Sequence, residues 1–223
     1  VMFCGRRPLG VAVATLLGAL PCMLLNRAIF SPGTGADSVF AVAWVLGMEA
    51  PWAAAPLVLY LGQAVFAERF AWRQALASFG RALPKFLVFQ VLRAVLLGIV
   101  FLAPIVYVGM FFLNPIVLLE QPPLARVWSR RAAMNRLNLG HVVKLRALSA
   151  AVLLIGWWVA VRFLEAFGAL WRGAASAGPA TDDPVARLLS WPGQLAFWAV
   201  LALVTAFRFF AYLDARIRRE GWD

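Results

Sequence analysis

Polar side chains interrupt one long apolar stretch of this chain, residues 86–119, and a carboxylate follows it directly. If this stretch enters a membrane and folds back near Pro104, Arg93 and Asn114 reach a similar depth on adjacent arms, and Glu120 lies within reach of the long Arg93 side chain. Ionisable groups at such depth are costly, so they mark functional sites or specific contacts. We therefore expect Arg93 to contact Glu120 or Asn114; the alternative is that Arg93 only reaches the lipid headgroups.

Other residue types that perform chemistry are scarce. The sequence contains no metalloprotease, P-loop, hydrolase-elbow or dinucleotide-binding motif. His141 is the single histidine, and Cys4 and Cys22 are expected at different depths, too far apart for a disulfide. We therefore expect no catalytic residue, no cofactor and no metal site, and a protein that is not an enzyme.

The remaining charges near the apolar stretches have simple interpretations. Arg162 and Glu165 lie three residues apart on one helical face and should pair locally. Arg208 is near the inner end of the last stretch, where we expect its side chain to extend toward the headgroups. Glu49 is at the outer start of the second stretch. A proton or ion path would need a series of acids through the membrane midplane, and the sequence offers none, which argues against an ion-driven pump.

The composition requires a lipid environment. The chain has 223 residues, of which 63% are hydrophobic, and its net charge is +11, with a mean hydropathy of +0.81. Apolar runs of this density cannot all be buried inside so small a soluble domain. The sequence therefore predicts one all-α transmembrane domain, a polytopic helix bundle that comprises residues 1–223.

The spacing of the apolar runs predicts about six membrane segments. A helix needs about 20 residues to cross the hydrocarbon core, and most of the runs reach that length alone or with a flanking extension. The second can extend back over residues 39–48, with a bend at Pro51. The third is too long for one span, so we divide it into a hairpin of two short arms. The expected segments are residues 11–30, 50–66, 86–103, 105–119, 142–164 and 194–213.

The distribution of basic residues supports the hairpin. With two short arms, both ends of the chain lie on one face, and that face holds every Lys and Arg except Arg27, Arg162, Arg172 and Arg187. With a single crossing, the basic residues divide almost equally. Because Lys and Arg concentrate in short cytoplasmic loops, the hairpin arrangement is favoured and both termini are expected in the cytoplasm. Arg greatly outnumbers Lys, which is typical of a GC-rich bacterial genome, and hence of a bacterial inner-membrane protein.

Two basic amphipathic helices are expected at the cytoplasmic interface, over residues 71–83 and 124–139, each with a tryptophan on its apolar face. The simpler interpretation is that they anchor and orient the protein. The alternative is a specific site for anionic lipid headgroups or an acidic partner. Because the arginines alternate with membrane segments, lipid is a nearer anion than nucleic acid, which we do not expect to bind. The candidate contacts are Arg73, Arg81, Lys85, Arg126, Arg130, Arg131 and Arg136.

The segment FFLNPIVLLEQPPLARVWSRRAAMNRLNLGHVVKL, residues 111–145, resembles the central part of a group of bacterial integral membrane proteins. This group includes the membrane domain of some glycerophosphodiester phosphodiesterases and its stand-alone relatives. The ending FFAYLDARIRREGWD is similar to their tail after the last span. The resemblance implies six segments with both ends cytoplasmic. It implies no activity, because the phosphodiesterase chemistry of the fused relatives belongs to a separate soluble domain.

These observations lead to two functional expectations. The first is a non-catalytic membrane scaffold or accessory subunit that docks other membrane-protein subunits through its spans and its basic cytoplasmic face. The second is a permease-like protein that handles a lipid or a small solute. A polar cavity that reaches Arg93 and Asn114 would favour the second, whereas a tightly packed bundle with a large exposed apolar face would favour the first.

Overall fold

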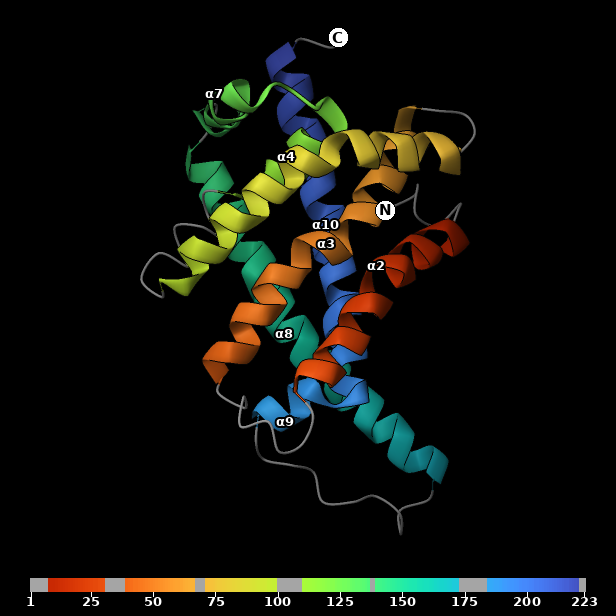
Figure 1. Cartoon of the computed structure of the whole chain (residues 1–223). Coiled ribbons are helices and arrows are strands. Elements are labelled where there is room, and N and C mark those ends of the chain that lie inside the picture. The colour runs from red at the N-terminus through yellow and green to blue at the C-terminus, as the bar shows by residue number, and fades with distance from the viewer. Residues whose placement is uncertain are drawn as a thin grey trace.

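The computed structural model describes residues 8–30, 39–66, 71–99, 110–136, 139–172 and 184–220, and these ranges are almost entirely helical, joined by short turns and without a strand. Five long helices dominate it (Figure 1): α2 (Pro8–Ile29), α3 (Val39–Phe66), α4 (Trp72–Gly98), α8 (Leu139–Arg172) and α10 (Trp191–Glu220). The shorter elements are α6 (Leu113–Pro115), the π-helical turn η2 (Ile116–Glu120), α7 (Leu124–Arg136) and α9 (Pro184–Leu189). All five long helices are long and apolar enough to cross a membrane. The fold is therefore that of a multi-pass helical membrane protein.

Two of the long helices continue through prolines at which the sequence predicts a break or a boundary. Pro51 and Pro56 both lie inside α3. Pro84 lies inside α4, so the interfacial helix expected over residues 71–83 and the arm expected from residue 86 form one helix. A proline removes one backbone hydrogen bond, but membrane helices tolerate this where neighbouring helices and local adjustments satisfy the freed carbonyl. The expected hairpin turn at Pro104 lies outside the described residues.

Small residues allow α2 and α3 to approach closely. Ala14, Gly18 and Cys22 follow one another at intervals of four residues and are buried on the face of α2 that meets α3. A Cβ atom at Gly18 would overlap the backbone carbonyl of Ala53, so the two backbones are in contact at this point. Without a hydrophobic driving force in lipid, such close backbone packing is a main source of helix association.

The segment after α4 returns to the start of that helix. Lys85 Nζ donates hydrogen bonds of 2.8 Å to the carbonyl oxygens of both Gln121 and Pro122. Gln121 has a left-handed backbone (φ 48°), which ends η2, and its side-chain amide donates to the Ser78 carbonyl at 2.9 Å. The apolar stretch therefore begins and ends in the same part of the molecule. The α7 helix and the carboxyl end of α10 lie at that same end, at the top of Figure 1.

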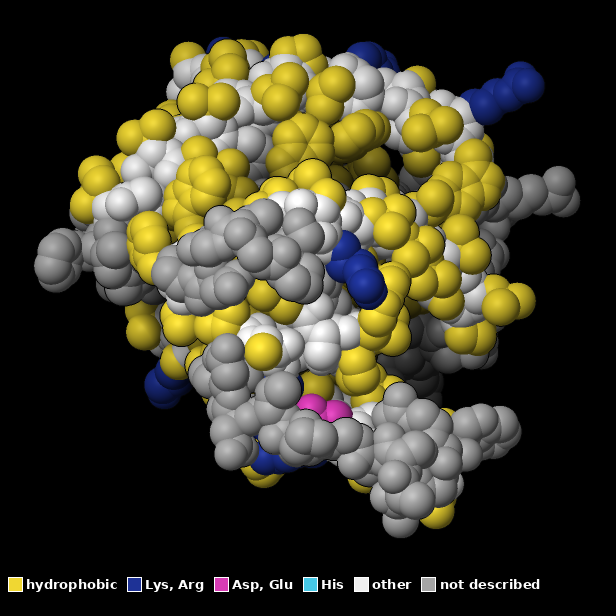
Figure 2. Space-filling model, turned by 60° about the horizontal axis from the view of Figure 1, so that its bottom comes forward, with side chains coloured by type: hydrophobic (Ala, Val, Ile, Leu, Met, Phe, Trp, Pro, Cys, Tyr) yellow, Lys and Arg dark blue, Asp and Glu magenta, His cyan; other side chains and the backbone are white. Residues whose placement is uncertain are grey.

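The core has two parts. The larger one joins α3, α4, the segment 110–120 and the carboxyl half of α10, and includes Phe86, Phe112 and Tyr212. The smaller one, at the end near α9, joins α2, α3 and α10. In contrast, α8 is the least buried span: only 11% of its apolar window is buried, against 56% for α3. Figure 2, in which the bottom of Figure 1 comes forward, shows hydrophobic side chains over much of the described surface, with few charged side chains among them.

Candidate functional site: an intramembrane cavity with two arginines

Arg93 and Asn114 line the same cavity, which has a volume of about 340 Å³. Its longest walls come from α3 and α10, and shorter parts come from α4, segment 110–115, α8 and α9. Most of the lining is apolar: Leu46, Val58, Leu97, Leu153, Leu188 and Phe197 are among its residues. The volume lies in the range of about 300–1,000 Å³ that is typical of small-molecule sites.

The polar side chains of the lining are few and carry positive charge. They are Arg93 from α4, Arg208 and Thr205 from α10, and Asn114 from α6, and no acidic residue of the described ranges lines the cavity. Asn114 Nδ2 donates a 3.4 Å hydrogen bond to the Pro51 carbonyl, which fixes its orientation beside α3. The cavity is therefore apolar with a cationic portion.

One face of α10 shows how the two kinds of lining are arranged. Its cavity residues recur at helical spacing and change from apolar to basic along the helix: Phe197, Leu201, Thr205 and Arg208. At 1.5 Å per residue, the two ends of this row are about 16 Å apart. On α4, Leu97 is one turn from Arg93. Apolar and basic lining are thus segregated along the length of the cavity.

Two arginine side chains lie close to the ring of Phe111, at the basic end of the cavity. The guanidinium carbon of Arg208 lies 4.9 Å from the centre of the Phe111 ring, and that of buried Arg146 lies 5.4 Å from the same centre. The two guanidinium groups are therefore within about 10 Å of each other. At an effective dielectric constant of about 20, their repulsion is on the order of 1–2 kcal/mol, which the attraction of each cation to the ring offsets in part.

Four acidic side chains are described, and each one is engaged away from this cavity. Glu165 lies 3.4 Å from Arg162, as the sequence predicts, and 3.2 Å from Arg187. Asp214 pairs with Arg218 on the same helix. Glu120 and Glu49 have the partners given below, and none of the four lines the cavity. Within the described part of the chain, the charge of Arg93 has no acidic neighbour in an ion pair.

In the described part of the chain, Arg93 makes no hydrogen bond or ion pair with the expected partners Glu120 and Asn114. Glu120 accepts hydrogen bonds from Arg130 Nε at 2.6 Å and from the Tyr212 hydroxyl at 2.5 Å. The reason is the position of the returning segment: the bonds from Lys85 hold residues 121 and 122 beside the start of the span. Lys85 precedes Arg93 by about 12 Å of helix, beyond the reach of Glu120. Arg93 and Asn114 do line the same cavity.

The basic residues proposed as lipid or partner contacts separate into two groups. Arg73, Arg81 and Arg126 are exposed and available to lipid headgroups. The others serve the fold: Lys85 and Arg130 make the bonds described above, and Arg131 stacks on Trp128 at 4.3 Å, where burial lowers the pKa of its guanidinium. The side chain of Arg136 lies outside the described residues.

Sequence reasoning missed three contributors to the cavity. Arg208 was expected to extend toward the headgroups, but it lies over Phe111 and lines the cavity with Thr205. The four-residue and three-residue spacing of Phe197, Leu201, Thr205 and Arg208 was the available signal for a shared face. No local signal marks Phe111, because its role depends on arginines from two distant helices.

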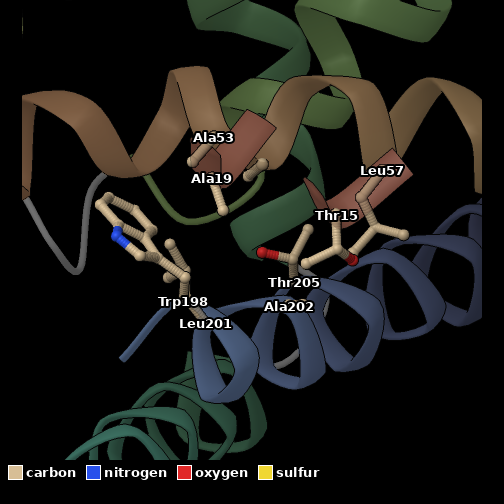
Figure 3. A pocket seen from close by; sticks show the side chains of 9 residues that line it. Thr15, Ala19, Ala53, Leu57, Trp198, Leu201, Ala202 and Thr205 are labelled. Carbon is tan, nitrogen blue, oxygen red and sulfur yellow. The ribbon is translucent and has the colours of Figure 1, made fainter. Parts of the chain in front are cut away.

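A much smaller cavity of about 10 Å³ lies where α2, α3 and α10 meet, between Thr15, Leu57 and Trp198 (Figure 3). It is about the size that one water molecule needs, so it leaves no room for a ligand. Leu201 and Thr205 line both cavities and separate one from the other.

The sequence also gave no role to a buried pair between α2 and α3. Asn26 is fully buried, and its Nδ2 donates a 2.8 Å hydrogen bond to Glu49 Oε2. Glu49 is 6% exposed. Because this carboxyl faces the neighbouring helix, it joins two spans and does not line a space that could hold a ligand.

A comparison with protein-family models, with curated proteins and with solved structures finds no match to this chain. The five apolar helices and the all-helical fold define the class as a multi-pass membrane protein.

Proposed function

We propose that this protein handles a lipid or a small solute within the membrane and binds it in the cavity between α3, α4 and α10. The observation that carries the proposal is a cavity of about 340 Å³ that reaches both Arg93 and Asn114. An apolar pocket with a few convergent polar groups is the usual form of a small-molecule site. Polar side chains placed at depth in a membrane also mark ligand pathways.

The proposal includes the number of membrane segments and the orientation of the protein in the membrane. The protein spans a bacterial inner membrane with six segments, the two short central ones forming a hairpin, and with both termini in the cytoplasm. The bonds of Lys85 to Gln121 and Pro122 support an even number of crossings, because the hairpin starts and ends in one place. Exposed Arg73, Arg81 and Arg126 then face the cytoplasmic leaflet, with α7 at its surface. The resemblance to the membrane domain of glycerophosphodiester phosphodiesterases supports the same arrangement.

The experiment compares what remains bound to the purified protein and to a variant with a filled cavity. The protein is extracted from its native membrane in mild detergent, and bound lipids and small molecules are identified by mass spectrometry. Ala50→Phe projects a ring into the cavity, whereas Ala12→Phe on the exposed face of α2 is the matched control. We expect a stoichiometric ligand on the wild type and on Ala12→Phe, and little on Ala50→Phe. Equal recovery from all three proteins would refute the proposal.

A scaffold or accessory subunit is the second candidate, and the exposure of α8 favours it. Trp158, Phe163 and Phe167 are more than half exposed on this helix, and a partner helix can cover such a surface as well as lipid can. The same preparation tests this role. A stoichiometric protein partner that is lost after substitution of Phe163 by Ala would support it.

A further inference from the structure

We propose that the ligand of this cavity is an anionic amphiphile, with a phosphate or carboxylate head held by Arg93 and Arg208 and a hydrocarbon chain along the apolar walls. This inference rests on the proposed function and names the chemical class of its ligand. The shared chemistry is an acidic head on an apolar chain, whether the molecule is a membrane lipid or a free amphiphile.

The charge of the lining requires an anion. Arg93 and Arg208 enter one cavity from different helices, and among the residues that the structure describes no acidic one lines it. Arg146 adds a further positive charge close to the ring on which Arg208 stacks. Guanidinium groups match the geometry of phosphate and carboxylate oxygens, and bonds to such groups are among the strongest in proteins. An anion between Arg93 and Arg208 therefore lowers the repulsion between the two guanidinium groups.

The length and polarity of the cavity require more than an anion. A free inorganic ion would occupy only the basic portion, whereas the lining continues for about 16 Å along α10 to Phe197. Leu153, Leu188 and Leu201 add apolar side chains from three elements. Water in such a space is poorly hydrogen-bonded, so a hydrocarbon chain is the occupant that these walls favour.

The side chain of Asn114 indicates which head group of the ligand the cavity favours. Its Nδ2 donates to Pro51, so the side-chain oxygen remains available as an acceptor beside the arginines. An acceptor and two cationic donors suit a head that carries both an anionic oxygen and a hydroxyl. We therefore expect a monoester or a free acid to bind better than a fully esterified head.

The test uses the full chain in nanodiscs of neutral phosphatidylcholine and three photoreactive probes. All three carry the same diazirine-bearing dodecyl chain, and their heads are phosphate, trimethylammonium and hydroxyl. After illumination, mass spectrometry of peptides identifies the labelled residues. We expect saturable labelling by the phosphate probe near Phe197 and Leu201, which unlabelled dodecyl phosphate prevents and inorganic phosphate does not.

Variants connect the label to the arginines. Arg93→Gln and Arg208→Gln should each weaken the binding of the phosphate probe at least tenfold, and Arg208→Lys should weaken it less than Arg208→Gln. Arg73→Gln is the matched control, because Arg73 is on the same helix as Arg93 but is exposed and away from the cavity. The comparison of the three heads on the wild-type protein needs no variant and therefore holds even if a variant fails to fold.

The outcomes separate this inference from the proposed function. Saturable labelling of equal strength by all three probes would overturn the anionic head and leave lipid or solute handling in place. Prevention of the label by inorganic phosphate alone would overturn the amphiphile in favour of a simple anion. The absence of saturable labelling by every probe, together with no ligand on the purified protein, would overturn both.

Discussion

The contacts of Glu120 give the sharpest prediction on stability. This carboxylate joins three elements, because Glu120 is the last residue of η2 and accepts hydrogen bonds from Arg130 on α7 and Tyr212 on α10. Glu120→Gln keeps the shape of the side chain but removes its charge. We expect the variant to lose stability and α7 to detach from the rest of the molecule more easily.

The expected loss of unfolding free energy follows from how deeply the Glu120–Arg130 ion pair is buried. The Glu120 and Arg130 side chains are 10% and 27% exposed, and their closest atoms are 2.6 Å apart. A hydrogen bond to a charged group contributes about 1.5–3 kcal/mol. Breaking a fully buried pair costs about 3–5 kcal/mol, whereas an exposed pair contributes about 0–1 kcal/mol. Because Arg130 keeps some contact with solvent and glutamine still accepts one bond, we expect a loss of about 2 kcal/mol.

Two measurements check this value. The free energy of unfolding is measured in mixed micelles by raising the mole fraction of dodecyl sulfate and following the helical circular dichroism. The rate of trypsin cleavage within α7 reports the local opening of this helix. A double-mutant cycle with Arg130→Gln isolates the pair and should give a coupling energy of about 1–2 kcal/mol.

The control is the ion pair between Asp214 and Arg218, whose closest atoms are 3.0 Å apart. Their side chains are 51% and 65% exposed. Its cycle, Asp214→Asn with Arg218→Gln, should give about 0.3–0.5 kcal/mol. If the Glu120 cycle gave no more than this control, burial of the pair would not be what holds α7, and the reasoning would be refuted.

Further substitutions test the packing of the spans. Gly18→Ala should destabilise the protein by about 1–3 kcal/mol, because its Cβ overlaps the facing backbone, whereas Gly80→Ala, which meets nothing within 4 Å, should stabilise it by about 0.5–1 kcal/mol. Asn26→Leu removes the hydrogen bond that Asn26 donates to buried Glu49 and should cost about 1.5–3 kcal/mol, while the double variant with Glu49→Leu should recover most of this loss. Lys85→Met removes two bonds to the returning segment and should speed trypsin cleavage after that segment.

Each of these predictions has a result that contradicts it. Equal unfolding free energies for Gly18→Ala and Gly80→Ala would exclude close backbone contact between α2 and α3. If the double variant of Asn26 and Glu49 were as unstable as Asn26→Leu alone, the loss would come from packing and not from an unpaired carboxyl. Unchanged cleavage of Lys85→Met would show that the returning segment is held without that side chain.

Much of the fold was predictable because the bilayer restricts backbone structure to a few forms. The apolar runs expected from the sequence begin within a few residues of the starts of α2, α8 and α10, whereas α8 and α10 continue well beyond the expected ends. Five helices are long enough to span a membrane. The helix ends were less certain. Residues 71–83 and the arm from residue 86 were expected as separate elements, but both belong to one continuous helix, α4, with Pro84 inside it.

The candidate site was only half predictable. The isolated position of Arg93 and Asn114 in an apolar stretch was enough to identify them as important, and the two do line one cavity. Their expected partner Glu120 belongs to a different cluster, because the return of the chain to Lys85 sets its position. A contact between residues about 90 positions apart, such as Tyr212 with Glu120, leaves no local pattern in the sequence.

The sequence by itself determined the environment of this protein, its helical class and the excess of positive charge, since these depend on composition and on the period of the apolar residues. Only the tertiary structure decided what surrounds each arginine. Arg130 meets a carboxylate, whereas Arg93 and Arg208 line a largely apolar cavity. The physical reason is that the free-energy cost of burying a guanidinium group depends on which groups the packed helices place within a few ångströms of it. That placement results from the fold as a whole.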